Sequence, residues 1–302
     1  MKNLQVVCVG HLVYDIRDYV KEFPQPDKTS FLMRPPAVSA GGSAANVAFN
    51  LIKMGHSAGL VSNVGNDAHG NFLLSELKKE KISHAHVKKI KNGRTGLSVI
   101  LINRKGSVMV VEDVGCVDAP RKLPANYIGS SKWVHITGCD YSWMLQACKA
   151  AKKAGVPISL DPGRAASRLG EKKLSKLFYA AELLIINQTE LEAIAGSRSF
   201  EKVKYLSKKY DMSVILKTGH GPAIACMKGE KIFDVPPFNA PYVVDTLGAG
   251  DAFASGVISG ILEKRSVYEA IRMGHACAAA KVMNAGAQAM PKRKTIRKRF
   301  KF

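Results

Sequence analysis

The stretch that decides how this chain folds is Val244-Asp245-Thr246-Leu247-Gly248-Ala249-Gly250-Asp251-Ala252-Phe253-Ala254-Ser255-Gly256. Two carboxylates, Asp245 and Asp251, enclose a run of small residues, and an apolar pattern of helical period follows. Small residues let backbone N–H groups approach an anion closely, and a helix start leaves such groups unpaired. Two interpretations are open here. Asp251 accepts a proton in a phosphoryl-transfer site, or it caps a helix after a glycine-rich turn.

The composition is that of an ordinary globular protein, with 302 residues, of which 46% are apolar and 23% charged. This length predicts one large α/β domain with a small appendage. No apolar run reaches the roughly 18 residues that span a bilayer, and no secretory signal precedes the first strand. We therefore expect a cytoplasmic protein without a membrane partner. The six cysteines occur singly, which favours small buried hydrophobes over a zinc site or disulfides.

The formal net charge of +21 is compatible with nucleic-acid binding, with anionic substrates or with a basic proteome. Most lysines lie late in predicted helices, where a cation complements the helix dipole and stays solvated. The basic segment 292–301 could bind a polyanion, but a solvated C-terminus explains it more simply. Because no recognition helix or zinc pattern accompanies it, a nucleic-acid-associated protein is only the alternative from another class, and no nucleic-acid partner is expected.

Strand-like and helix-like segments alternate along most of the chain. Short apolar runs predict strands at 5–9, 58–64, 133–137, 158–160, 183–186 and 213–217. Periodic patterns predict helices at 43–54, 71–81, 143–154, 172–181, 190–195, 200–210, 252–263 and 267–283. This alternation predicts an α/β fold with a mainly parallel central sheet that helices cover on both faces.

Two β-rich segments interrupt the alternation. Residues 14–20 and 30–39 are expected to be extended, and 95–102 and 107–113 are expected to form a hairpin. We expect these strands to pair as a small separate sheet. The main α/β domain would then comprise 1–10, 40–93 and 115–302, and the small sheet 11–39 and 94–114.

A second glycine-rich stretch, Ala40-Gly41-Gly42-Ser43-Ala44-Ala45-Asn46-Val47-Ala48, begins a predicted helix. Ser43 is available as its cap, and Asn46 lies in its first turn among residues small enough to leave room for a ligand. Close packing of helix on strand would select the same small residues. Several polar residues follow strand ends, where open α/β sheets bind ligands: Asp15, Asp140, Asp161, Asn187, Thr218 and Gly219.

Taken together, these motifs resemble those of the ribokinase-like, or PfkB, family of carbohydrate and nucleoside kinases over nearly the whole chain. Asp245 to Asp251 is similar to the family signature D-T-x-G-A-G-D, and Gly41 to Asn46 is similar to its G-G-x-x-x-N signature. Asn187-Gln188-Thr189-Glu190 matches its N-x-x-E motif. The resemblance implies a three-layer sandwich with a mainly parallel central sheet and a small β-sheet lid, which pairs two subunits in several relatives. A homodimer through the lid is therefore expected.

The resemblance also implies roles for individual residues. Asp251 would be the catalytic base, and the amides of Gly248, Ala249 and Gly250 would form the anion hole. Asp245 would lie beside a monovalent-cation site, which would allow activation by K⁺, although a hydrogen-bonded structural carboxylate is equally compatible with the sequence. ATP and Mg²⁺ would be held by a further set, with Glu190 acting on Mg²⁺ through water: Asn187, Glu190, Thr218, Gly219, Gly221 and Asn284.

The acceptor is expected to be a sugar phosphorylated at a hydroxymethyl group, because Asp15, Gly42 and Asn46 resemble the family's hydroxyl binders. A nucleoside is the alternative, for which His11, Phe31, Met33 and Met109 offer base contacts if they do not simply pack on each other. A sugar acid bound by Arg164 ranks third. The chain departs from ribokinase-type members at Gly115-Cys116-Val117, and it lacks the asparagine of sugar-acid kinases after Asp161.

Overall fold

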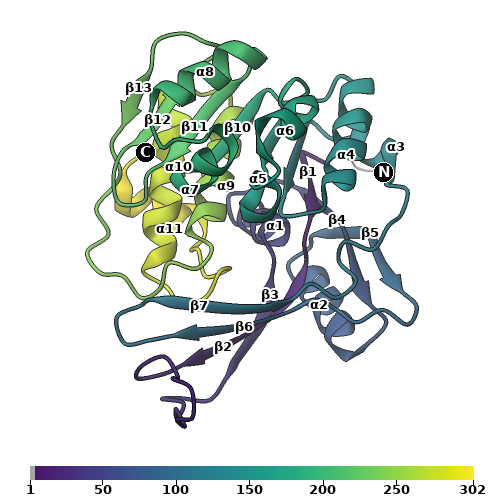
Figure 1. The fold of residues 1–302 in the computed structure, drawn as a ribbon, viewed down its shortest axis with the longest axis vertical. Helices are drawn as coiled ribbons and strands as arrows, with labels where there is room; N and C mark the ends of the chain where they lie inside the picture. The colour runs from purple at the N-terminus through teal and green to yellow at the C-terminus, as the bar shows by residue number, and fades with distance from the viewer. Residues whose placement is uncertain (1–3) are drawn as a thin grey trace.

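The computed structural model describes residues 4–302, and two β-sheets form its framework (Figure 1). The larger sheet has nine strands in the order β5-β4-β1-β8-β9-β10-β11-β12-β13. All neighbours from β5 to β11 are parallel, whereas β12 and β13 add antiparallel strands at one edge. The strands are β1 (Val6–Gly10), β4 (Ala58–Gly65), β5 (Ser83–Ile90), β8 (Trp133–Thr137), β9 (Ile158–Asp161), β10 (Leu183–Asn187), β11 (Ser213–Lys217), β12 (Ala223–Cys226) and β13 (Phe233–Val235).

Helices cover both faces of the larger sheet, which confirms the predicted fold. One face packs against α4 (Tyr141–Lys153), α6 (Gly170–Phe178), α7 (Gln188–Ala195) and α8 (Glu201–Tyr210). The other packs against α1 (Ser43–Lys53), α2 (Ala68–Lys79), α9 (Ala249–Leu262) and α10 (Val267–Val282). The remaining helices are α3 (Ala125–Gly129), α5 (Gly163–Ser167) and α11 (Arg293–Phe300).

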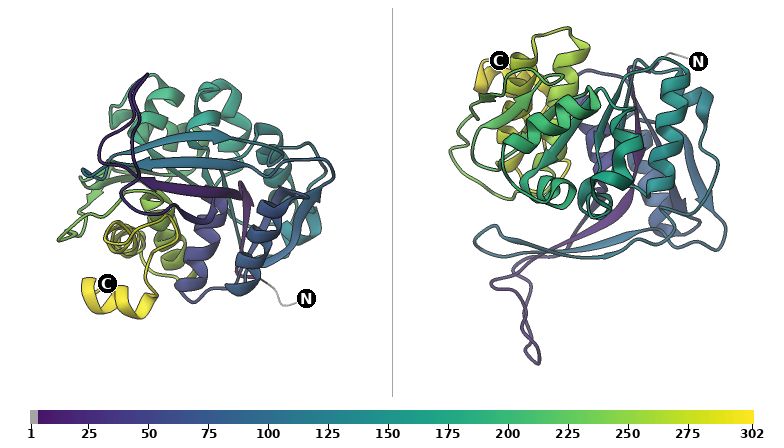
Figure 2. Two further views of the ribbon diagram at one scale, coloured as in Figure 1. Left: turned by 90° about the horizontal axis from the view of Figure 1, so that it is seen from below. Right: turned by 45° about the horizontal axis from the view of Figure 1, so that its top comes forward.

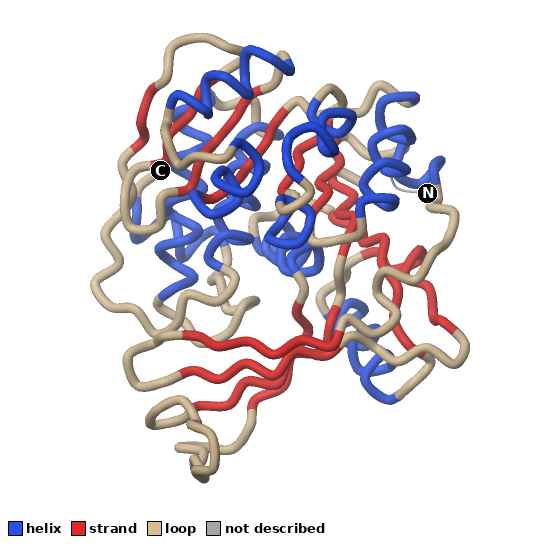
Figure 3. The backbone as a smooth tube through the Cα atoms, in the orientation of Figure 1, coloured by secondary structure: helices blue, strands red, loops and turns tan. Residues whose placement is uncertain are grey.

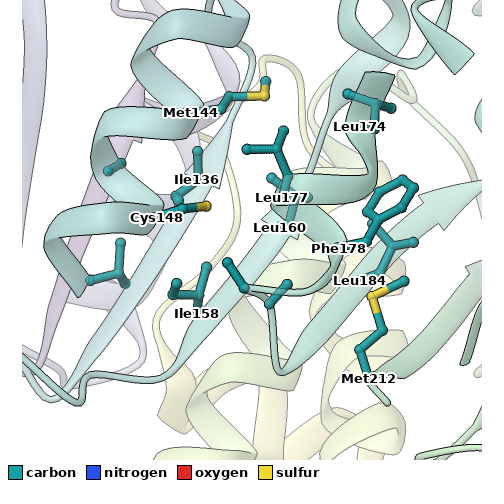
Figure 4. Packing of buried hydrophobic residues seen from close by; sticks show 14 of the residues in the cluster. Ile136, Met144, Cys148, Ile158, Leu160, Leu174, Leu177, Phe178, Leu184 and Met212 are labelled. Carbon is teal, nitrogen blue, oxygen red and sulfur yellow. The ribbon is translucent and has the colours of Figure 1, made fainter. Parts of the chain in front are cut away.

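The central strands are apolar on both faces because side chains alternate along a strand and both faces are buried. In β1, Val7 and Val9 join one core cluster, whereas Val6 and Cys8 join the other. Figure 4 shows part of the first cluster, in which residues of β8, β9 and β10 contact side chains of α4 and α6. This packing holds the sheet between two helical layers, so the loops at the strand ends are supported by a well-packed base.

The smaller sheet has the order β3-β2-β6-β7 and contains β2 (Val13–Tyr19), β3 (Ala37–Gly41), β6 (Leu97–Ile102) and β7 (Val108–Asp113). It lies below the main body in the view of Figure 3, as predicted for a small separate sheet. Only the end of the predicted extended segment 30–39 is a regular strand, and Pro35 and Pro36 precede it. Because β1 ends at Gly10 and β2 begins at Val13, this sheet adjoins the C-terminal ends of the central strands.

The basic C-terminal segment is solvated at its basic side chains, as expected, but it is a helix that packs on the core through its apolar face. Residues 293–300 form α11, in which Ile296 is 1% exposed and Phe300 7%. These two residues are four positions apart and therefore share one helix face, which packs into a cluster with Met54 and Met273. Most of the basic residues lie on the opposite face of the helix, which is exposed to solvent.

The six cysteines are free and buried, as expected for small core residues. Burial raises the pKa of Cys148 and of Cys277 to about 12, which leaves both thiols protonated and unreactive at neutral pH. Within residues 4–302, no helix has both the length and the apolar character needed to cross a membrane.

Candidate active site

The C-terminal ends of β9, β10 and β11 and the first turns of α1 and α9 lie close together, as the positions of polar residues in the sequence predicted. The closest link is between the two glycine-rich motifs. Asn46 Nδ2 donates a hydrogen bond of 2.8 Å to Asp251 Oδ2, although the two residues are 205 positions apart. The two stretches that were singled out in the sequence therefore form a single site.

Asp251 lies inside the first turn of α9, and Gly248 rather than Asp251 occupies the cap position. Gly248 has a left-handed backbone conformation with φ of 73°, which favours glycine. The helix starts at Ala249, earlier than predicted, and the N–H of Ala249 donates to the carbonyl of Thr246 at 3.2 Å. The backbone N–H groups of Gly250 and Asp251 come next. At this position in a helix an N–H group has no intrahelical acceptor and lies at the positive end of the helix dipole.

The surroundings of Asp251 raise the pKa of its carboxyl group to about 6. Burial is the largest cause, and the charge of Asp161 adds to it. The hydrogen bond from Asn46 and the ammonium of Lys217 act in the opposite direction. Asp251 is therefore mostly ionised at neutral pH and keeps a higher proton affinity than an ordinary aspartate, which suits a general base.

Lys217, which was not recognised in the sequence, ends β11 and forms an ion pair of 2.9 Å with Asp161. Its pKa is raised, because the charges of Asp161 and Glu190 outweigh the effect of burial. A Cβ atom on Gly250 would lie 3.5 Å from Lys217 Nζ, so the ammonium group lies beside the first turn of α9. A lysine at the end of an apolar strand is the only signal that the sequence offers for this position.

Asn187 and Glu190 form a capping box at the start of α7, which explains their spacing locally. Burial and the charge of Asp161 raise the pKa of Glu190 to about 7. Within residues 4–302 no group of three His, Cys, Asp or Glu side chains is suited to hold a metal ion. Three acidic residues, Asp161, Glu190 and Asp251, nevertheless lie near the single positive charge of Lys217. Such a set is compatible with a Mg²⁺ ion that keeps most of its water ligands.

The turn after β11 contains the three predicted nucleotide contacts Thr218, Gly219 and Gly221. Thr218 Oγ1 donates a 2.7 Å hydrogen bond to the carbonyl of Pro222, so its side chain stabilises the turn itself. Gly219 is exposed and has φ of 77°. This turn therefore offers backbone rather than side-chain groups to a ligand.

Asp15, on β2 of the smaller sheet, is 4% exposed and lies close enough to Asp251 for the two charges to interact. Burial raises its pKa to about 7, and the charge of Asp251 contributes to this increase. A Cβ on Gly41 would lie 2.0 Å from Asp15 Oδ2, and one on Gly42 would lie 2.5 Å from the carbonyl of His11. The glycine pair is thus required for the carboxylate and the backbone to approach this closely.

Two residues that sequence reasoning missed lie near Asp15 and Asn46. Arg17 is 9% exposed, and its Nε has no hydrogen-bond partner within residues 4–302. It is two positions from Asp15 on the same strand and therefore on the same face. Gln288 Nε2 donates to Asn46 Oδ1 at 3.4 Å. To predict these two residues from the sequence, one would have to know the strand register and the position of the final turn. No local sequence pattern supplies either.

Two predicted residues are less central. Arg164 is exposed on α5, although its charge still lowers the pKa of Glu190. Asn284 Nδ2 donates to the carbonyl of Ala280 at 2.9 Å and so closes the end of α10. Neither side chain contacts the Asn46–Asp251 pair.

The four candidate base-contacting residues do not gather at the site. His11 Nε2 is hydrogen-bonded to Asp118 at 2.9 Å. Phe31 is 81% exposed and Met33 52%, on a loop that extends away from the body in the right-hand view of Figure 2. Met109 is 42% exposed on β7. Their arrangement gives no support to a stacking site for a nucleobase.

Asp245, at the other end of the loop, is 0% exposed and forms an ion pair with Lys281, which is 0% exposed as well. Asp245 Oδ2 accepts a 2.7 Å hydrogen bond from the N–H of Gly286, and Oδ1 accepts one of 3.1 Å from the N–H of Leu247. Burial lowers the pKa of Lys281, and the hydrogen bond and charge of Asp245 oppose that decrease.

Comparison with known proteins identifies the family of the chain. The family model described as pfkB family carbohydrate kinase matches residues 3–294. The chain is 30% identical to an ATP-dependent ribose-1-phosphate kinase of Halopiger xanaduensis, with 95% of each chain covered. It is 27% identical to a nucleoside kinase of Methanocaldococcus jannaschii, with 95% of this chain and 93% of the relative covered.

A solved structure with the same fold contains both substrates of a kinase. Arabidopsis thaliana ribokinase in complex with ribose and ATP has a TM-score of 0.86 and 27% sequence identity to this chain, with 99% of each chain covered. The motifs, the fold and these similarities agree. The chain belongs to the PfkB family of carbohydrate kinases, which are phosphotransferases with an alcohol group as acceptor.

Proposed function

We propose that this protein is an ATP- and Mg²⁺-dependent kinase that phosphorylates a hydroxymethyl group of a sugar, with Asp251 as the base. The observation that carries this proposal is the 2.8 Å contact between Asn46 and Asp251 in the first turn of α9. It joins a hydroxyl-binding amide, a carboxylate with a pKa of about 6 and the anion-binding end of a helix.

In the proposed reaction, Asp251 accepts the proton of the acceptor hydroxyl. The hydroxyl oxygen bonds to the γ-phosphorus while the bond to the β–γ bridging oxygen breaks, and ADP leaves. The N–H groups at the start of α9 and the ammonium of Lys217 stabilise negative charge on the transferring group. Glu190 would hold Mg²⁺ through water, and the ion would neutralise part of the charge of the phosphates. Asp15 and Asn46 orient the sugar hydroxyls.

The test is ADP release measured with ribose, ribose 1-phosphate, fructose, adenosine, inosine, cytidine and 2-keto-3-deoxygluconate. We expect sugars to give the highest kcat/KM. A response to nucleosides alone would overturn the sugar assignment. A response to 2-keto-3-deoxygluconate alone would assign a sugar acid, for which the exposed Arg164 is the candidate contact.

A sugar that carries a phosphate is the second candidate acceptor, and Arg17 favours it. A buried guanidinium attracts an anion, and arginine binds phosphate with two parallel hydrogen bonds. The relative from Halopiger xanaduensis is named for a phosphorylated ribose. If this candidate is correct, Arg17→Gln raises the KM for ribose 1-phosphate at least about tenfold, the value expected for a lost charged hydrogen bond, and leaves ribose unaffected. Equal effects on both acceptors would contradict it.

We also propose that the smaller sheet is a lid that closes over the acceptor and pairs two subunits. Exposed apolar side chains on its strands and loop support this proposal, namely Leu32, Val38, Val110 and Val111. Light scattering is expected to show a dimer, and the double substitution Val38→Glu and Val111→Glu is expected to yield a monomer. A wild-type monomer at micromolar concentration would refute the pairing.

A further inference from the structure

A buried ion pair, between Lys281 and Asp245, lies next to the loop that leads into the proposed anion hole. Lys281 projects from the last turn of α10, and Asp245 precedes the loop that leads into α9. Lys281 Nζ contacts Asp245 Oδ1 and also donates to the backbone carbonyl of Asp245 at 3.1 Å. Two oxygens of the same residue therefore face one ammonium group.

The remaining contacts of Asp245 come from hydrogen-bond donors. Its carboxylate accepts the N–H groups of Leu247 and Gly286 in addition to the ammonium of Lys281. A monovalent cation binds to oxygen lone pairs, and here amide hydrogens and an ammonium occupy the positions that it would need. The residues present do not fit the K⁺ site that the family resemblance implied for Asp245.

The pair also acts on the geometry of the anion hole. Gly286 belongs to the turn that supports Gly248, because a Cβ on Gly248 would lie 2.7 Å from the carbonyl of Ala287. The N–H of Val244 donates to the carbonyl of Val282 at 2.7 Å, next to Lys281. The ammonium thus holds Asp245 against α10, and the Asp245 carboxylate holds the turn at Gly286. The loop 245–248, which leads directly into the first turn of α9, is fixed by both contacts.

From these contacts we infer that the Lys281 ammonium takes the place of a bound monovalent cation, so that the kinase needs neither K⁺ nor Na⁺. This inference rests on the proposed function, because the loop it describes is the proposed anion hole. Lys281 is a positioning residue: it orders the helix start through Asp245 and contacts no substrate. Any charge-neutral residue at this position would leave the Asp245 carboxylate buried without a counterion.

The first test compares ADP release by the wild type in tetramethylammonium chloride and in KCl at matched ionic strength. Tetramethylammonium is too large to enter a buried site, so a cation requirement would appear as low activity in that salt. We expect the two rates to agree within about twofold, since no site for K⁺ is left. Activation by K⁺ of more than about tenfold would overturn the inference.

The second test replaces the lysine with side chains of two sizes. Lys281→Ala opens space beside Asp245, so its turnover should fall about 100-fold in tetramethylammonium and recover in KCl. Lys281→Met fills that space, so its lost turnover should not recover. Lys149→Ala, an exposed position on α4, is the matched control and should respond to neither salt. Full activity of Lys281→Ala without K⁺ would contradict the positioning role.

Thermal unfolding gives a readout that does not depend on turnover. The Tm of Lys281→Ala should rise by about 4 °C or more on exchange of tetramethylammonium for K⁺, whereas the wild-type Tm should stay constant. If both variants fail to fold, the wild-type salt comparison and the wild-type Tm still decide the question. Absence of turnover with every acceptor in every salt would reject the proposed function, while the Tm comparison would still test the ion pair.

Discussion

Asp245 lies just before the start of α9 and Asp251 in its first turn, yet the surroundings of the two carboxylates are opposite in character. Asp245 is sealed from solvent, with a lysine and two backbone amides as donors. Asp251 remains partly accessible, accepts a hydrogen bond from Asn46 and has its pKa raised to about 6. Burial alone therefore does not identify a catalytic carboxylate. The difference lies in whether the fold supplies a full counter-charge or leaves the group with a high affinity for protons.

The largest effect should come from Asp251→Asn. Loss of the base should lower kcat about 1000-fold, within the range seen for general bases, while nucleotide binding persists. Because the folded-state pKa lies above the ordinary value, the ionised carboxylate destabilises the fold above about pH 6. The free energy of unfolding should therefore rise by roughly 1–2 kcal/mol in mildly alkaline buffer. Near-normal turnover would remove Asp251 from the mechanism.

Asp245→Asn should lower the free energy of unfolding more than it lowers turnover. The substitution leaves the Lys281 ammonium buried without a charged partner, and breaking a buried pair in this way costs about 3–5 kcal/mol. Urea unfolding checks this value, with Asp234→Asn as the exposed control. An unchanged midpoint would mean that the ion pair contributes nothing to the fold, and the contrast with Asp251 would fail.

The smallest effect is a displacement of the pH–rate profile. Asp251 must be ionised to act, so kcat/KM should fall tenfold per pH unit below about pH 6 and level off above it. Lys217 lowers the pKa of Asp251, so Lys217→Met should move the midpoint to higher pH. Lys149→Met should leave it in place. A profile without a break between pH 5 and 7 would exclude a base with the surroundings of Asp251.

Much of the fold could be predicted from the sequence, because buried parallel strands appear as short apolar runs between helical patterns. The strand Ser83–Ile90 was missed, since it lies at the edge of the sheet and carries Lys88 and Lys89. The packing of the C-terminal helix α11 was missed for a related reason. Its basic residues dominate the composition, whereas only Ile296 and Phe300 decide how it packs.

The site was predictable where backbone conformation requires particular residues, as at Gly248, or where a motif joins a loop to a helix, as at Asn46 and Asp251. Lys217 and Lys281 could not be predicted in the same way. Each is a single lysine in an apolar segment, and its partner is set by tertiary packing. Lys281 meets Asp245 only because α10 returns beside the loop that precedes α9.

The hydrogen bond from Gln288 to Asn46 joins residues 242 positions apart, and Asn46 in turn contacts Asp251. Closing so long a loop is entropically costly, and such contacts form late when a chain folds. Helices and strands can therefore be complete before Asn46 has met Gln288 and Asp251. During refolding, the return of turnover should lag behind the return of circular dichroism, which makes activity the stricter measure of a finished fold.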